Sequence, residues 1–391
     1  MNDLTIKSTP PSRREIPHTV SPGLWTLAWR RLRTDSVAMV CLAIVAAFLM
    51  LVLLSGLNII AGDWAKEVGV NYAPPSFLDY EPPPAAPVLQ NAIPDTVEPA
   101  TATPGSAFNS TVVDPLADVM KEIEAQKNPP ATEGKSVDPL ADVMKEIQSG
   151  KGAAAAITDT RRATLPFGAD KWGRDVIAKT IKGSETSIFV GLAAALVATL
   201  IGTVLGAFAG YYGGWIDDAL NWFYNVFSSI PYLLLILAVA AVLQQKGTLT
   251  IVLILGLTGW TGAFRLIRAE YLKHKGREYV QAADAIGASN SRRMFRHIFP
   301  NVSHVVLVQM SILVVAFIKS EVILSFLGFG VPVDVVSWGS MLNEAQNELI
   351  LGKWWQLAAA GGAMAVLVTA FSLFTDALRD ALDPKLRGAE G

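Results

Sequence analysis

The sequence predicts an all-α polytopic membrane protein with about six transmembrane helices and a long low-complexity extracytoplasmic insertion. Of its 391 residues, 51% are hydrophobic and only 17% are charged, whereas a soluble domain carries roughly 25% charged residues. The apolar residues are gathered into six runs, each near the ~20 residues that a helix needs to cross a bilayer. Backbone groups in lipid must pair within their own segment, so these runs are expected to be helical.

The six predicted spans differ in length and in how they are bounded. The first is uncharged between Asp35 and Asp63, and the fourth, which is the shortest, lies between Lys246 and Arg265. The spans are residues 36–61, 187–211, 219–245, 247–264, 302–326 and 354–375. The second span has a small residue at every fourth position, which presents a smooth strip that another helix can approach closely. The strip consists of Ala194, Ala198, Gly202, Gly206 and Gly210.

Lysine and arginine residues beside the spans predict the orientation of the chain. They precede the first span, fill the connector 265–300 between the fourth and fifth spans, and follow the sixth. Such residues concentrate on the cytoplasmic side of membrane proteins, and an even number of spans places all three regions on one side. We therefore expect a cytoplasmic N-terminal arm at 1–35 and a cytoplasmic tail at 381–391.

An unusually long connection of about 125 residues, from Gly62 to about Thr186, separates the first two spans, and residues 62–164 of it are the predicted insertion. Its stretch 73–104 is rich in Pro and Ala and is expected to sample extended states. An eleven-residue segment then occurs twice without change, at 113–123 and 137–147. In each copy an Asp-Pro pair suits the start of a helix, but two turns are too short to be stable alone. The duplication is interpreted as a weakly ordered spacer or as a docking element for a partner.

The sequence contains few of the residues that enzymatic or metal chemistry requires. With one cysteine, Cys41, and four histidines, neither an intrachain disulfide nor a structural zinc pattern is expected. There is no glycine-rich loop ending in Lys-Ser or Lys-Thr that would cradle phosphates, and no serine-nucleophile motif. We therefore predict no catalytic residue, no metal site and no cofactor site on this chain.

The connector 265–300 is the most informative segment of the sequence. Its centre reads Gln281-Ala282-Ala283, Gly287 follows, and after nine residues the segment ends in His-Ile-Phe-Pro300. This spacing resembles the cytoplasmic signature loop of permease subunits of binding-protein-dependent ABC importers, which has Glu-Ala-Ala, Gly and Ile-x-Leu-Pro at the matching places. Gln, His and Phe replace the Glu, Ile and Leu of the family pattern.

A second motif lies before the second span. Phe167-Gly-Ala-Asp170 is followed by two residues and then by Gly173-Arg174-Asp175. This resembles the C-type permeases of dipeptide, oligopeptide and nickel importers, with Ala169 in place of Thr. Further matches occur at 210–214, 229–232, 324–330 and 338–342. The resemblance covers about 167–387 and the first span, and it implies a type I ABC importer fold with its permease core at 165–380.

The resemblance also implies a role and an assembly. The chain would be a transport subunit rather than an enzyme, serving a peptide importer in the bacterial cytoplasmic (inner) membrane. Its partners would be a second related permease, two ATPase subunits that bind ATP and Mg, and an extracytoplasmic solute-binding protein. Loop 265–300 would couple to the ATPase. The coupling residues implied are Glu278, Tyr279, Gln281, Ala282, Ala283, Asp284, Gly287 and Pro300.

Other interpretations of the connector and of the chain stay open. Basic clusters beside a membrane also attract anionic lipids. A compact surface of small residues favours insertion into a protein cleft instead, and no nucleic-acid partner is predicted. That surface is expected to comprise Ala282, Ala283, Ala285, Gly287 and Ala288. The alternative functions are a non-transporting membrane scaffold or sensor and a six-span secondary carrier. The solute is open among peptides, nickel, glutathione-like compounds and opines.

Charged residues mark two further candidate sites. Lys319 and Glu321 lie inside the fifth apolar run, where charges usually face a bundle interior or a cavity. They are interpreted either as a lining of the translocation path or its gate, or as a snorkelling lysine and a structural glutamate. Asp170, Arg174 and Asp175 are expected to form an ion-pair cluster that shapes the extracytoplasmic entrance.

Overall fold

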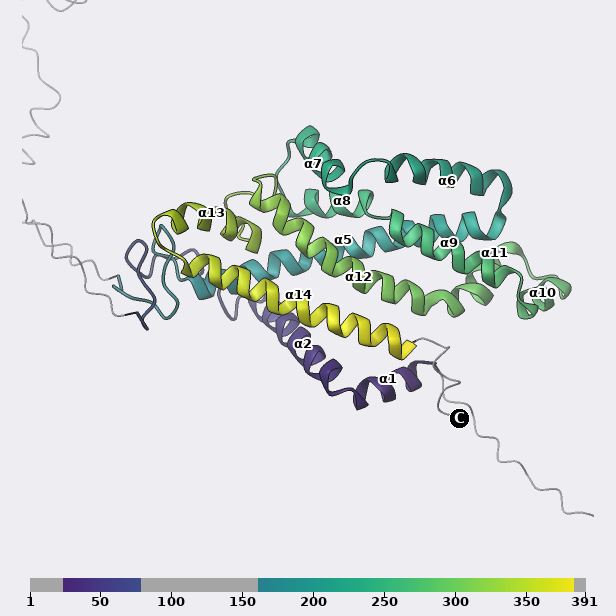
Figure 1. Ribbon diagram of the computed structural model, residues 1–391, viewed down its shortest axis with the longest axis horizontal. Coiled ribbons are helices and arrows are strands. Elements are labelled where there is room, and N and C mark those ends of the chain that lie inside the picture. Colours follow the sequence, from purple (N-terminus) through teal and green to yellow (C-terminus); the bar gives the residue numbers. More distant parts are fainter. Residues whose placement is uncertain (1–23, 79–160, 383–391) are drawn as a thin grey trace, which may run out of the picture. The chain divides into compact units, whose positions relative to one another are not determined.

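The computed structural model describes residues 24–78 and 161–382, which form a bundle of helices without β-strands (Figure 1). Four runs within these ranges are long and apolar enough to cross a membrane. They correspond to the first, second, fifth and sixth predicted spans. Their helices are α2 (Ser36–Gly56), α5 (Val176–Tyr212), α12 (Phe299–Phe326) and α14 (Trp355–Leu382).

The third and fourth predicted spans are each divided into two helices. α6 (Gly214–Ser228) and α7 (Tyr232–Leu243) meet at 84°, and α8 (Thr248–Thr258) and α9 (Thr261–Lys275) meet at 41°. The sequence predicts one helix over each of these stretches, so the structure corrects both. The sharper bend falls before Pro231, whose ring disfavours helical geometry in the residue before it. Counting each bent pair as one span gives six spans.

Shorter helices and side-chain caps complete this part of the chain. Asp35 begins α2 by accepting hydrogen bonds from the N–H groups of Val37 and Ala38, 2.9 and 3.2 Å away. Ser337 begins α13 through a reciprocal capping box with Ser340. Such caps pair N–H groups that have no partner inside the helix. The remaining elements are α1 (Leu24–Thr34), α10 (Glu278–Ala285), α11 (Asn290–Arg292), the π-helical turn η1 (Arg293–Ile298) and α13 (Trp338–Ile350).

Helix α5 is the centre of the bundle and packs against α8, α9 and α12. The glycines of the small-residue strip predicted on this helix face α9, which confirms the expected close approach. A methyl group added at Gly202 would lie 2.6 Å from Trp260 O, and one added at Gly206 would lie 2.7 Å from Phe264 O. The strip therefore allows the two backbones to come nearer than any larger side chain would permit.

The two flanks of the predicted insertion fold against each other. Gly69 pairs with Arg162, and Pro75 pairs with Leu165, through isolated backbone bridges. Ala73 and Leu165 are buried together in a small apolar cluster. These flanks thus belong with the helices, although the sequence assigns 62–164 to the insertion. Both copies of the duplicated segment, and nearly all of the Pro- and Ala-rich stretch, lie outside the described residues.

The close contact between the strip and α9 predicts that a glycine-to-alanine substitution lowers the unfolding temperature more at a strip position than at an uncrowded helical glycine. Gly206→Ala should lower the thermal unfolding temperature of the purified chain, because its methyl group meets backbone atoms of α9; overpacking of this kind costs about 1–3 kcal/mol. Gly361→Ala on α14 is the matched control, since its methyl group would meet nothing within 4 Å. Equal unfolding temperatures for the two variants would contradict the packing described for α5 and α9.

Candidate functional site

The predicted coupling segment lies at one end of the bundle, beyond the ends of α5, α9 and α12 (Figure 1). It comprises α10, the turn at Gly287, α11 and η1, and it leads into α12. Gly287 has φ +79°, a left-handed conformation that glycine adopts without steric cost. The Ser289 side chain then accepts a hydrogen bond from the N–H of Arg292, at 3.4 Å. The segment therefore turns at Gly287 and is capped again at Ser289 before η1.

Apolar side chains anchor this segment to the bundle. Val280 of α10 and Met294 and Ile298 of η1 are buried in a cluster with residues of α5, α9 and α12. The Tyr271 hydroxyl donates a hydrogen bond to the Met294 carbonyl oxygen at 3.3 Å. Closely packed apolar groups resist displacement, so this cluster ties the segment to α9 and α12.

Polar contacts also fix this segment. The Arg293 guanidinium lies 2.6 Å from an oxygen of Asp284 and donates to the Asn290 side chain at 2.5 Å. The Tyr211 hydroxyl of α5 donates to the same Asn290 oxygen at 3.1 Å. His274 and Tyr279 share a hydrogen bond of 2.9 Å. Arg293 thus joins the end of α10 to the start of α11.

The structure separates the predicted coupling residues into an exposed and a buried set. Ala283 is buried, and Ala288 is buried beside it, with its N–H donating to the Ala283 carbonyl oxygen at 3.0 Å. The expected single surface of small residues is therefore incomplete, because these two alanines face the bundle. The exposed predicted residues are Glu278, Tyr279, Gln281, Ala282, Asp284, Gly287 and Pro300.

Sequence reasoning missed two residues of this segment. Ile286 is 84% exposed at the tip beside Gly287, and Arg293 is the residue that pairs with Asp284. No sequence signal marked Ile286 as exposed, because it follows Ala283 at the i, i+3 spacing of a shared helix face. No sequence signal singles out Arg293 from the neighbouring arginines.

At the opposite end of the bundle, the three residues predicted to shape an entrance have separate roles. Asp170 is fully buried and pairs with Lys179 at 2.8 Å rather than with Arg174. The Arg174 guanidinium lies over the rings of Trp172 and Trp64, at 4.5 and 5.3 Å. Asp175 caps α5 by accepting a hydrogen bond from Ile177 N–H at 3.0 Å. The expected mutual ion pairs are therefore not formed.

Lys179 instead organises a buried polar cluster that the sequence did not indicate. Its ammonium group contacts Asp170, Glu344 of α13 and Gln356 of α14. The Gln356 amide donates to the Met341 carbonyl oxygen at 3.1 Å and to Glu344 at 3.2 Å. Buried charges are stable only when paired, so this cluster holds α5, α13 and α14 together.

Glu348 adds a further carboxyl group beside this cluster. Its side chain is buried, and among the described residues neither carboxyl oxygen has a hydrogen bond of normal geometry. Burial, with smaller contributions from the Asp170 and Glu344 carboxylates, raises the pKa of Glu348 to about 7, although Lys179 opposes the shift. The carboxyl groups of Asp170, Glu344 and Glu348 outnumber the ammonium group of Lys179. This imbalance favours a protonated Glu348.

The two charges in the fifth predicted span face different surroundings. Lys319 is exposed on α12. Glu321 is fully buried and accepts a hydrogen bond from the Ser325 hydroxyl at 2.7 Å. The structure therefore does not bring them together as one site. Within residues 24–78 and 161–382, no three His, Cys, Asp or Glu side chains are grouped so as to hold a metal ion.

Two protein-family models match this chain. Residues 202–388 match the binding-protein-dependent transport system inner membrane component, and residues 23–83 match the N-terminal TM domain of oligopeptide transport permease C. The first match includes both the coupling segment and the α13–α14 part of the buried cluster. The second covers α1, α2 and the first flank of the insertion.

Named relatives cover the same region. The dipeptide transport system permease protein of Bacillus subtilis is 40% identical over 221 residues, 56% of this chain and 69% of that protein. The oligopeptide transport system permease protein of Salmonella typhimurium is 41% identical over 221 residues, 56% of this chain and 72% of its own. Among solved structures, a chain of the inward-facing methionine ABC transporter matches 52% of this chain and 96% of its own length, with 13% identity and a TM-score of 0.43.

The raised pKa of Glu348 predicts a pH-dependent stability. The folded chain retains a proton on Glu348 up to about pH 7, whereas an unfolded glutamate releases it near pH 4.5. This contribution to stability is therefore complete below about pH 4.5 and is lost as the pH rises through about 7. Thermal unfolding of the purified chain should show a falling midpoint over that range, and Glu348→Gln should flatten the fall. Glu278→Gln, on the exposed surface of α10, should leave the slope unchanged. Parallel pH curves for wild type and Glu348→Gln would contradict the burial argument.

Proposed function

The chain belongs to the family of binding-protein-dependent transport system inner membrane components, and from that premise we propose that it carries peptides into the cell. It is a permease subunit of an ABC importer. The support for peptides is its identity of about 40% to permeases named for dipeptide and oligopeptide transport, which continues over 221 residues.

Family membership implies a partner permease and ATPase subunits, and we propose one specific assembly. A second related permease, two ATPase subunits and an extracytoplasmic solute-binding protein would complete the importer. ATP and Mg would bind to the ATPase subunits, because this sequence has no glycine-rich loop for phosphates. The binding protein would select the solute, while this chain would supply half of the path through the membrane.

The arrangement of the helix ends supports a cytoplasmic location for both termini. Ala28 of α1, Val308 of α12 and Leu382 of α14 are buried together, so the first and last described helices meet near one end of the bundle. α10 lies towards the same end (Figure 1). The neighbouring segments are rich in Arg and Lys, which the positive-inside rule assigns to the cytoplasm. This end would therefore face the ATPase.

The coupling segment supports an alternating-access mechanism. The ATPase would hold the exposed face of α10, which includes Glu278, Tyr279 and Gln281. When ATP draws the two ATPase subunits together, α10 would move with them, and the apolar anchor around Met294 would pass the movement to α9 and α12. The chain would then change from inward-facing to outward-facing. ATP can shift this equilibrium only if the ATPase contacts differ between the two states.

Uptake by a deletion strain tests the proposed solute. Cells that lack this gene should lose uptake of radiolabelled peptides, and a plasmid copy should restore it. Nickel uptake, measured in the same cells, is the internal control and should not change. Loss of nickel uptake with peptide uptake intact would contradict the proposed solute. If neither changed, and no ATPase or second permease co-purified with the chain, the result would favour the scaffold or the secondary carrier.

A substitution at Gly287 tests the coupling role. Gly287→Leu should leave membrane insertion intact and separate ATP hydrolysis from uptake, because a side chain at φ +79° strains the turn beside α10. A left-handed conformation costs a residue with a Cβ atom roughly 1–2 kcal/mol, which is enough to reshape an exposed turn without unfolding the bundle. The measurement is ATPase activity and peptide uptake by the reconstituted importer.

The matched control for that variant is Gly276→Leu. Gly276 ends α9 with φ −83°, and neither glycine has an atom within 4 Å of an added Cβ. The control should therefore keep hydrolysis and uptake coupled. Equal uptake per ATP in Gly287→Leu and wild type would refute the role assigned to this turn.

A further inference from the structure

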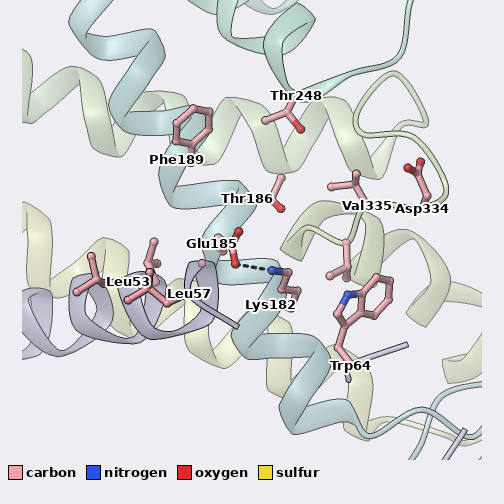
Figure 2. Close-up of a pocket in the computed structure, with 13 residues that line it drawn as sticks. Leu53, Leu57, Trp64, Lys182, Glu185, Thr186, Phe189, Thr248, Asp334 and Val335 are labelled. Carbon is pink, nitrogen blue, oxygen red and sulfur yellow. Dashed lines mark hydrogen bonds and ion pairs between the residues drawn. The ribbon is translucent and has the colours of Figure 1, made fainter. Parts of the chain in front are cut away.

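A pocket of about 610 Å³ lies at the end of the bundle opposite α10, between α2, α5 and the loop that precedes α13. Figure 2 shows Leu53 and Leu57 along one side, Phe189 and Thr248 above, and Asp334 at the far edge. Most of its lining is apolar. Charged side chains come from Lys182 and Glu185 of α5 and from Asp334 of the loop.

These charges are unequally satisfied. The Lys182 ammonium lies 2.8 Å from a Glu185 oxygen, and the same oxygen accepts a hydrogen bond from the Ser55 hydroxyl at 2.9 Å. Asp334 is exposed and, in the described part of the chain, has no hydrogen-bond or ion-pair partner for its carboxylate. The pocket therefore presents the Lys182 ammonium and the Glu185 carboxylate, which pair with each other, and the unpaired Asp334 carboxylate of the described loop.

The pocket continues into an exposed apolar face. Phe189, Leu192, Leu196 and Leu200 follow each other along α5 at helical spacing and are 38–56% exposed. Leu53 and Leu57 of α2 are 59% and 63% exposed on the other side of the pocket. In a chain that spans a bilayer, a place where charged side chains border such a face lies near the boundary between headgroups and acyl chains.

We propose that this pocket binds a zwitterionic phospholipid with a primary amine, such as phosphatidylethanolamine. The lipid ammonium would donate hydrogen bonds to the free Asp334 carboxylate, and the phosphate would contact Lys182. An acyl chain would lie along the exposed face of α2 and α5. A quaternary ammonium has no N–H to donate, and an anionic headgroup would meet the two carboxylates, so both other lipid classes fit less well. A peptide is also zwitterionic, but it has no long apolar chain to cover that face.

Lipid retention tests this proposal. The chain, with whichever subunits co-purify, is placed in nanodiscs of equal phosphatidylethanolamine, phosphatidylcholine and phosphatidylglycerol, and native mass spectrometry counts the lipids kept through graded delipidation. Phosphatidylethanolamine should be retained preferentially. Asp334→Asn should lower that preference about threefold to tenfold, the range expected when the net contribution of one ordinary hydrogen bond is lost at an exposed site. Asp218→Asn, the same change on α6 away from the pocket, should have no effect.

A second variant fills the pocket without disturbing the fold. Gly56 lines it, and a Cβ there would meet only the Glu185 carboxyl carbon, at 4.0 Å, so Gly56→Leu should fold and should also reduce retention. Equal retention of the three lipids, or unchanged preference in both variants, would overturn the proposal. Displacement of the lipid by a dipeptide at similar concentration would overturn it in favour of a solute site.

Discussion

The close contact between α5 and α9 is the constraint on which the other arrangements depend. It exists because Gly202, Gly206 and Gly210 leave the α5 backbone uncovered where α9 crosses it. α9 then carries Tyr271, which hydrogen-bonds to η1, and Arg268, which forms two bonds of 2.6 Å with Asp217 of α6. The placement of the coupling segment and that of the bent third span therefore both depend on how close α9 lies to α5.

The opposite end of the bundle is held by charge rather than by small residues. Lys179, near the start of α5, reaches carboxyl and amide groups from the loop before it and from α13 and α14. Removing one partner from a buried ion pair is strongly destabilising, because the remaining charge stays buried. α5 therefore joins two ends of the bundle that are stabilised by different kinds of interaction. Apolar packing anchors the α10 end, and an ionic cluster holds the other end.

Most of the fold could be predicted from local composition, whereas contacts between residues far apart in the sequence could not. The spans were predictable because a run of apolar residues is a local signal, and so was the strip on α5, which depends only on spacing. The break between α6 and α7 had a local signal in Pro231, but apolar residues continue on both sides of it, so hydrophobicity alone predicted one helix. The cluster at Lys179 was not predictable, because Glu344 lies 165 residues further along the chain. The spacing of the coupling segment indicated its place in the chain, but burial decided that Ala283 faces inward.

The paired flanks of the insertion have a consequence for how this protein can change over time. Gly69 and Arg162 lie next to each other, so whatever connects them leaves and returns at one point on the bundle. The entropy of closing a flexible loop rises only slowly with length, by about 0.6 kcal/mol for each doubling. Lengthening a flexible connection between two such points therefore costs little free energy of folding, and the sequence between them contains a duplication, at 113–123 and 137–147. This connection is a place where new sequence can accumulate, or a foreign domain can be grafted, with the helices left as they are.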